Sequence, residues 1–153
     1  MGSEPTEITT DGTKVWKNIN GDLHREDGLA IIWKDGTQYW YKNDNRHRED
    51  GPAIIYPDGD KRWYIHGKRH REDGPAVIFP DGSQQWFING NLHRGDGPAV
   101  INHNTQKSRY YIHGLDVTDR VLDWMKRDGL HGDLTPDDMR IFVFEFDITE
   151  KTL

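Results

Sequence analysis

The 153-residue chain is long enough for one domain with a core, and its formal net charge is -6. Its 33% hydrophobic and 30% charged residues are a balance found in disordered chains, but those are poor in aromatic residues, whereas this chain has six Trp, six Tyr and five Phe. The absence of Cys excludes a disulfide framework, a thiol nucleophile and a thiolate metal site. We therefore expect a thin, elongated fold.

Charge and hydropathy limit the classes of partner that the chain is expected to bind. Residues 115–153 hold ten acidic and five basic residues, and the rest of the chain is nearly neutral. Neither part has the basic footprint of a nucleic-acid binder, so no direct nucleic-acid binding is predicted. The N-terminus lacks the blocks of a signal peptide, and no apolar run approaches membrane-spanning length. We expect no membrane contact and a cytoplasmic location, in the host cytoplasm if the protein is viral. Residues 1–10 are expected to form a flexible N-terminal tail.

A 23-residue period runs through residues 11–114. Each unit carries the motif His-Arg-x-Asp-Gly-x-Ala, usually with Glu at the third position and Pro at the sixth. The motif begins at His24, His47, His70 and His93. Trp residues share the period, at Trp40, Trp63 and Trp86. The period indicates a tandem array of one structural unit.

Each unit is predicted to contain two short strands. Segments 53–56 and 76–79 are β-branched and aromatic, and each leads into an Asp-Gly turn. The return strands, such as 62–65, end at His-Gly or Asn-Gly pairs that suit tight hairpin turns. The predicted fold is mainly β: a meandering antiparallel sheet of four to five hairpins, stacked as a solenoid.

Alternation along the strands separates two aromatic rows. The Trp row is expected in the core. The opposite row is a candidate exposed strip for binding a partner. It consists of Tyr41, Tyr64, Phe87 and Tyr111. The alternative is that long neighbouring side chains pack over both rows.

The repeated His and Asp residues raise the question of a metal site. Equivalent residues two strands apart are separated by roughly 9.5 Å, too far to share one zinc ion with ligands at about 2.0–2.2 Å. The motif is better explained as turn architecture: Asp accepts backbone N–H groups, Arg pairs with carboxylates, and His packs beside the Trp row. No metal and no cofactor are predicted.

Catalytic motifs do not occur in the chain. There is no nucleophile elbow, phosphate loop or His-Glu-x-x-His sequence. Repetition itself argues against catalysis, because catalytic residues normally occur once. The chain is therefore predicted not to be an enzyme, although a hydrolase that uses the His/Asp row remains an alternative.

The unit resembles the MORN repeat, which has a similar length. The sequence Trp63-Tyr64-Ile65-His66-Gly67-Lys68-Arg69-His70, followed by Phe79-Pro80-Asp81-Gly82, fits its outline. The motif His-Arg-Glu-Asp-Gly-Pro-Ala replaces the His-Gly-x-Gly of that family and resembles variant repeats of tailed-phage and giant-virus proteins. The resemblance covers residues 11–114. It implies a β-hairpin array with a scaffold or binding role and brings no catalytic residues.

Residues 115–153 are predicted to cap the array with a helix and a strand. Asp116 or Thr118 can begin a helix that Gly129 ends. The sequence from Thr135 to Asp138 indicates a second helix start. Residues 141–148 are then expected to form a strand with one apolar face, whose free edge could pair with a second copy in a homodimer.

The prediction is a non-enzymatic, protein-binding repeat module. The phage-like resemblance points to a host or defence protein as the partner, with inhibition as the role. Binding is assigned to the aromatic strip or to the acidic residues Asp137, Asp138 and Glu145, which could occupy a basic groove of a nucleic-acid-binding enzyme. The alternative is a small-ligand or glycan binder with stacked aromatics as platforms.

Overall fold

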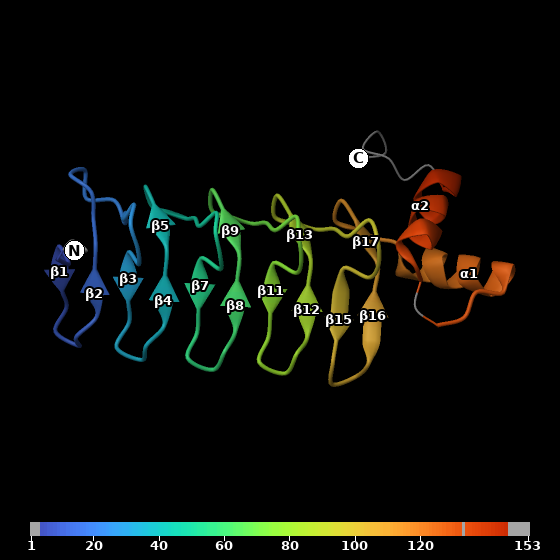
Figure 1. Cartoon of the computed structure of the whole chain (residues 1–153), viewed down its shortest axis with the longest axis horizontal. Coiled ribbons are helices and arrows are strands. Elements are labelled where there is room, and N and C mark those ends of the chain that lie inside the picture. The colour runs from blue at the N-terminus through green and yellow to red at the C-terminus, as the bar shows by residue number, and fades with distance from the viewer. Residues whose placement is uncertain (1–3, 133, 147–153) are drawn as a thin grey trace.

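The computed structural model describes residues 4–132 and 134–146. The fold is mainly β, with 18 short antiparallel strands followed by two helices. The strands form a row along the long axis of the molecule, and both helices lie at its C-terminal end (Figure 1). Within the described residues, neither helix is long and apolar enough to cross a bilayer.

Ten strands form one antiparallel sheet in which sequential hairpins lie side by side. The hairpins follow the predicted meander, and Asp-Gly turns such as Asp58-Gly59 connect their strands. From one edge to the other the strands are β1 (Glu7–Ile8), β2 (Lys14–Val15), β3 (Ile31–Ile32), β4 (Gln38–Tyr39), β7 (Ile54–Ile55), β8 (Lys61–Arg62), β11 (Val77–Ile78), β12 (Gln84–Gln85), β15 (Val100–Asn102) and β16 (Lys107–Arg109).

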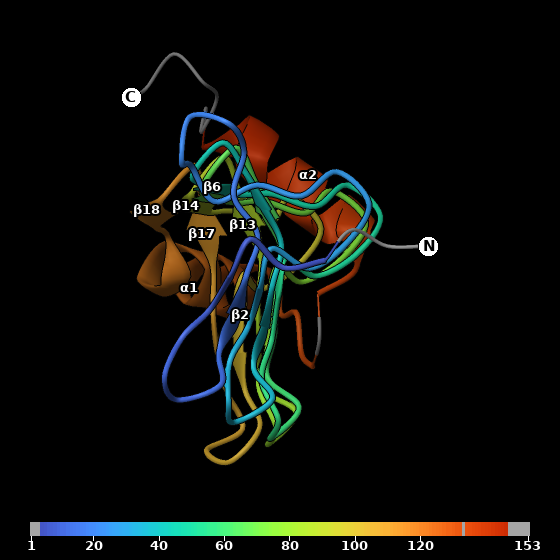
Figure 2. The same cartoon turned by 90° about the vertical axis from the view of Figure 1, so that its left-hand side faces the viewer.

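Four smaller hairpins lie alongside this sheet, one for each unit. They are β5 (Tyr41–Lys42) with β6 (Asn45–Arg46), β9 (Tyr64–Ile65) with β10 (Lys68–Arg69), β13 (Phe87–Ile88) with β14 (Asn91–Leu92), and β17 (Tyr111–Ile112) with β18 (Leu115–Asp116). Their turns use the predicted residues with positive φ, for example His66 at 48° followed by Gly67 at 78°. Viewed along the long axis, equivalent hairpins nearly superpose (Figure 2).

The single return strand predicted for residues 62–65 is wrong, because the chain leaves the large sheet at Trp63. β8 ends at Arg62, and β9 begins at Tyr64 in a separate hairpin. Trp63 connects the large sheet to the small hairpin. Its N–H donates to the Ala76 carbonyl at 2.8 Å, and its carbonyl accepts the His70 N–H at 3.3 Å. The backbone groups of Trp63 are therefore satisfied by the motifs rather than by a continuing ladder.

The predicted N-terminal tail, residues 1–10, contains one strand of the sheet. β1, at residues 7 and 8 of that range, pairs with β2. Lys17 forms an ion pair with Glu7 at 2.7 Å and fixes the start of the sheet. The sheet therefore begins at residue 7, before the predicted boundary at residue 11.

The core of the array is thin. The motif Ala of each unit is fully buried, as are Ile54 and Val77 to within 1%. Two small clusters form around these residues, one completed by Tyr64 and the other by Phe87. The motif Ala residues are Ala30, Ala53, Ala76 and Ala99. Because interiors are close-packed, a larger side chain at these fully buried positions would have to displace its neighbours.

The helices cover the last unit. α1 (Thr118–Asp128) ends at Gly129, whose φ of 68° is the left-handed cap expected there. α2 (Pro136–Glu145) begins with the Thr135–Asp138 capping box. The largest apolar cluster of the described chain joins this end of the array to both helices. It consists of Tyr110, Ile112, Val117, Val121, Trp124, Leu134, Met139 and Phe142.

The strand predicted for residues 141–148 is wrong as far as Glu145, because α2 continues to that residue. Phe142 is buried, whereas Phe144 is 86% exposed, so the two do not share a face. Met139 and Phe142 are three residues apart and point into the core together, which is helical spacing. The cap is helical where it is described, and a homodimer through a strand loses its basis for residues 141–145. Ile148 lies outside the described residues.

Candidate functional site

The predicted aromatic strip is not an exposed surface in the middle of the array. Tyr64 is 5% and Phe87 is 8% exposed, while Tyr41 and Tyr111 are half-buried. Arginines of the small hairpins lie over the buried rings, with Arg46 at 4.5 Å from the centroid of Tyr64 and Arg69 at 5.1 Å from that of Phe87. In the middle of the array the Tyr/Phe row is buried more deeply than the Trp row, the reverse of the expectation, whereas at the ends Trp16 and Tyr110 are each 6% exposed.

The Trp row is instead half-buried in the middle of the array and covered by the motif arginines. The Arg48 guanidinium lies 3.9 Å from the centroid of Trp40, and Arg71 and Arg94 lie at 4.2 and 4.1 Å from Trp63 and Trp86. The first unit repeats the arrangement with Arg25 over Trp16 at 4.4 Å. Each ring therefore meets a cation at the distance of a cation–π contact, and the guanidinium covers one face of the ring.

Each motif Arg also holds its own loop together. Arg71 Nε donates to Asp73 at 2.8 Å, and its Nη1 donates to the carbonyl of Pro75 at 3.3 Å. The same pair of bonds recurs in the other three units. The bond from Arg holds the pKa of the Asp27, Asp50 and Asp73 carboxyls below their ordinary value. The expectation that Arg pairs with a carboxylate of the motif is confirmed.

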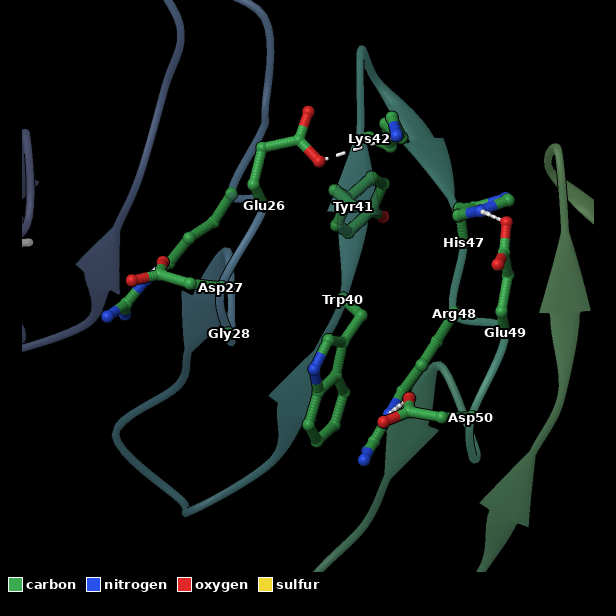
Figure 3. A pocket seen from close by; sticks show the side chains of 11 residues that line it. Glu26, Asp27, Gly28, Trp40, Tyr41, Lys42, His47, Arg48, Glu49 and Asp50 are labelled. Atoms are coloured by element: carbon green, nitrogen blue, oxygen red, sulfur yellow. Dashed lines mark hydrogen bonds and ion pairs between the residues drawn. The ribbon is translucent and has the colours of Figure 1, made fainter. Parts of the chain in front are cut away.

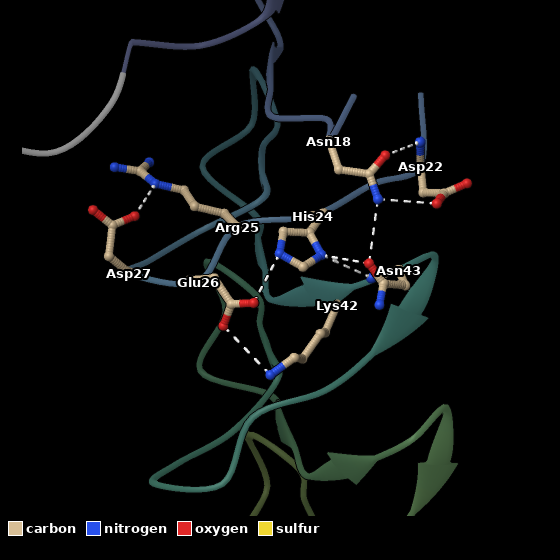
Figure 4. Close-up of polar contacts among 8 residues, drawn as sticks. All are labelled: Asn18, Asp22, His24, Arg25, Glu26, Asp27, Lys42 and Asn43. Atoms are coloured by element: carbon tan, nitrogen blue, oxygen red, sulfur yellow. Dashed lines mark hydrogen bonds and ion pairs between the residues drawn. The ribbon is translucent and has the colours of Figure 1, made fainter. Parts of the chain in front are cut away.

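Each motif His links its unit to the next. The His47 Nδ1 accepts the N–H of His66 at 3.1 Å, and the His93 Nδ1 accepts that of His113 at 3.0 Å. His24 and His70 accept equivalent N–H groups from the following turns. Figure 4 shows His24 between Glu26 and Asn43, with Lys42 bound to the same glutamate. At His47 the N–H donated to Nδ1 leaves the ring proton on Nε2, which faces Glu49. The Nδ1 atoms of His24 and His70 also lie 2.7 and 3.0 Å from the side-chain oxygens of Asn43 and Asn89.

Three equivalent grooves lie between successive motifs. The first groove has a volume of about 620 Å³ and is lined by residues 25–28, 40–42 and 47–50. Figure 3 shows its plan, with Glu26 and Asp27 on one side, Glu49 and Asp50 on the other, and Trp40 and Tyr41 between them. The second groove, about 670 Å³, and the third, about 740 Å³, repeat the plan around Trp63 and Trp86.

The second groove is the most acidic of the three. With histidine counted as neutral, its lining has four carboxylates against two guanidinium groups, a net charge of -2. Lys42 partly balances the first groove, and Arg140 balances the third. The side chains of Glu49 and Glu72 are 84% and 85% exposed, and both guanidinium groups of the second groove are already paired with Asp. Its rim therefore carries two carboxylates that no Lys or Arg neutralises among the ion pairs of the described residues.

The acidic residues predicted in the cap have local partners. Asp138 accepts the Thr135 N–H at 2.8 Å as part of the capping box. Hydrogen bonds from Thr135, first from its side chain, lower the pKa of the Asp138 carboxyl. Glu145 binds Arg127 at 2.6 Å, and Asp137 binds Arg140 at 3.1 Å. The structure does not gather the three into one surface with the aromatic row, and only Arg140 connects them to the third groove.

Nothing in the described residues assembles a metal centre, since no group of three or more His, Asp or Glu side chains lies in ligating range. Two histidine pairs lie close together: the rings of His47 and His66 are tilted with centroids 4.6 Å apart, and those of His93 and His113 stack at 4.3 Å. The Nδ1 atoms of His47 and His93 accept backbone N–H groups, which removes one ligating nitrogen from each pair.

Fold and grooves together define an antiparallel β-hairpin protein with one charged groove per unit boundary. No protein-family model, curated protein or solved structure gives a significant match to the chain. The grooves were missed at the level of the sequence, although one signal was present. In the last three units Trp and Arg are always eight residues apart, as in Trp63 and Arg71, a constant offset that two packed partners would keep.

Proposed function

We propose that the chain is a non-enzymatic module that binds a protein partner along its row of grooves. One observation carries the proposal: a groove lined by a Trp and by motif carboxylates recurs three times along the array, with Gly95 in place of one motif Glu in the third groove. A row of equivalent sites suits an extended or repetitive partner surface, whereas a catalytic site is normally built once. The stacking of successive units as a solenoid would make this face straight and rigid.

The nature of the partner follows from charge. Exposed carboxylates on the groove rims complement a basic surface, and such complementarity directs association and specificity. The resemblance to repeats of tailed-phage proteins supports a host or defence protein as the partner, and a nucleic-acid-binding enzyme would offer the basic surface required. Inhibition would follow from covering that surface.

The test is affinity capture with matched charge variants. The groove variant combines Glu49→Gln and Glu72→Gln, while the control combines Glu4→Gln and Asp123→Asn, two exposed acidic residues away from the grooves. Both variants lose two negative charges, so they have the same net charge. A protein retained by the wild type and the control but lost by the groove variant supports the proposal. Equal capture by all three proteins would contradict it.

A further inference from the structure

The spacing of the grooves carries information about the shape of the ligand. Each unit contributes two strands to the large sheet, and neighbouring strands lie about 4.7–4.9 Å apart. Successive grooves are therefore separated by about 9.5 Å along the array. A ligand that fills more than one groove must present equivalent groups at this interval and on one side.

One common backbone conformation meets both conditions. A polyproline II helix rises about 3.1 Å per residue and has three residues per turn, so every third side chain returns to the same face after about 9.3 Å. A β-strand advances by a similar distance in three residues, but its third side chain points to the opposite face. The groove interval therefore fits a polyproline II segment read at every third position.

The lining of the second groove indicates which side chains of a ligand it would bind. Its apolar lining consists of Pro52, Ile65 and the part of Trp63 that Arg71 does not cover, and its rim carries Glu49 and Glu72. Long basic side chains match this arrangement, because their methylene stems cover apolar surface while the charged head remains in contact with carboxylates. An anionic or purely apolar ligand would leave the rim charges without partners.

We infer that the grooves bind an extended, polyproline II-like segment of a protein partner that has Arg or Lys at every third residue. The second groove is the anchor, because it is the most acidic. This inference rests on the proposed function and adds the class of ligand.

Two synthetic peptides test the register. One contains four Arg-Pro-Pro triplets, and the other contains the same twelve residues with the four arginines placed together. Both have the same charge, so a purely electrostatic attraction would bind them equally. We expect the triplet peptide to bind at least about fivefold more tightly in fluorescence anisotropy, because it can fill several grooves at once. Equal affinities, or tighter binding of the clustered peptide, would overturn the inference.

The groove variant tests the location. The variant Glu49→Gln with Glu72→Gln should bind the triplet peptide about fivefold more weakly, since two exposed charge contacts are lost. The control Glu4→Gln with Asp123→Asn should bind it as tightly as the wild type does. Equal weakening by both variants would contradict the anchor. If neither peptide binds, but a captured protein is lost selectively by the groove variant, the ligand class is rejected and the proposed function is retained.

Discussion

Arg71 connects three parts of its unit: the Trp63 ring, the Asp73 carboxylate and the Pro75 carbonyl. Replacement by Ala removes all three contacts, and we expect the free energy of unfolding in urea to fall by about 1–2 kcal/mol. Replacement by Lys should recover little of this loss, because an ammonium lacks the planar fork that makes the contacts together. The exposed Lys61→Ala is the control and should stay within about 0.5 kcal/mol of the wild type. An Arg71→Lys variant as stable as the wild type would contradict the arrangement.

His93 should make stability depend on pH. Burial, and then the nearby His113, lower the pKa of His93, and Arg140 lines the same pocket. The unfolded chain therefore takes up a proton at this position first, as the pH falls through the ordinary value of about 6.5. The contribution of His93 to stability is present above that pH and is lost as the pH falls from there through the lowered pKa of the folded state. In the variant His93→Asn the side-chain oxygen can still accept the His113 N–H, but the side chain does not titrate. The melting temperature of this variant should therefore fall less than that of the wild type between pH 8 and pH 5. Equal decreases would show that His93 is not responsible.

At the scale of elements, α2 can be distinguished from the predicted strand by two phenylalanines. Phe142 is buried, and Phe142→Ala should lower the free energy of unfolding by about 3–5 kcal/mol. Phe144 is exposed, and Phe144→Ala should change it by less than about 0.5 kcal/mol. Chemical denaturation measures both. Equal losses would favour a strand in which the two rings share one face.

The elements that the sequence predicted correctly depend on local chemistry. The His66-Gly67 turn, the Gly129 cap and the Thr135 helix start each require particular residues at particular backbone angles. The errors arose where distant contacts decide. Alternation separates Trp63 from Tyr64 but does not say which faces the core, and that depends on Arg71 and Arg69 covering the rings. The Phe-rich segment of α2 fits two periods at once, and its packing on the last unit selects the helix.

At the scale of the whole molecule, the regular spacing predicts that one unit can be removed. Deleting residues 48–70 places His47 directly before Arg71 and restores the motif. The strands β7, β8, β9 and β10 are lost together, and β4, which pairs with β7, can then pair with β11, which pairs with β8. We expect a folded, shorter protein with one groove fewer and cooperative thermal unfolding, because units of this kind contact only their neighbours.

A half-unit deletion is the matched control. Removing residues 48–59 breaks the period, deletes Arg48 together with the rest of that motif, and should abolish cooperative unfolding. Circular dichroism on heating compares the two deletions. Similar behaviour of both would mean that the 23-residue period is not the unit of folding.

The uneven distribution of the apolar core has a consequence for how the molecule opens. Eight buried residues join the helices to the last unit, whereas the clusters in the middle of the array have three each. Local opening should therefore cost least near β1 and most beside α1 and α2, and amide hydrogen exchange should slow progressively along the chain. A ligand lying across the grooves would slow exchange in the middle units and leave the helical end unchanged. The helical end would then keep its stability with or without ligand, while the units that carry the grooves would be stabilised by the ligand they bind.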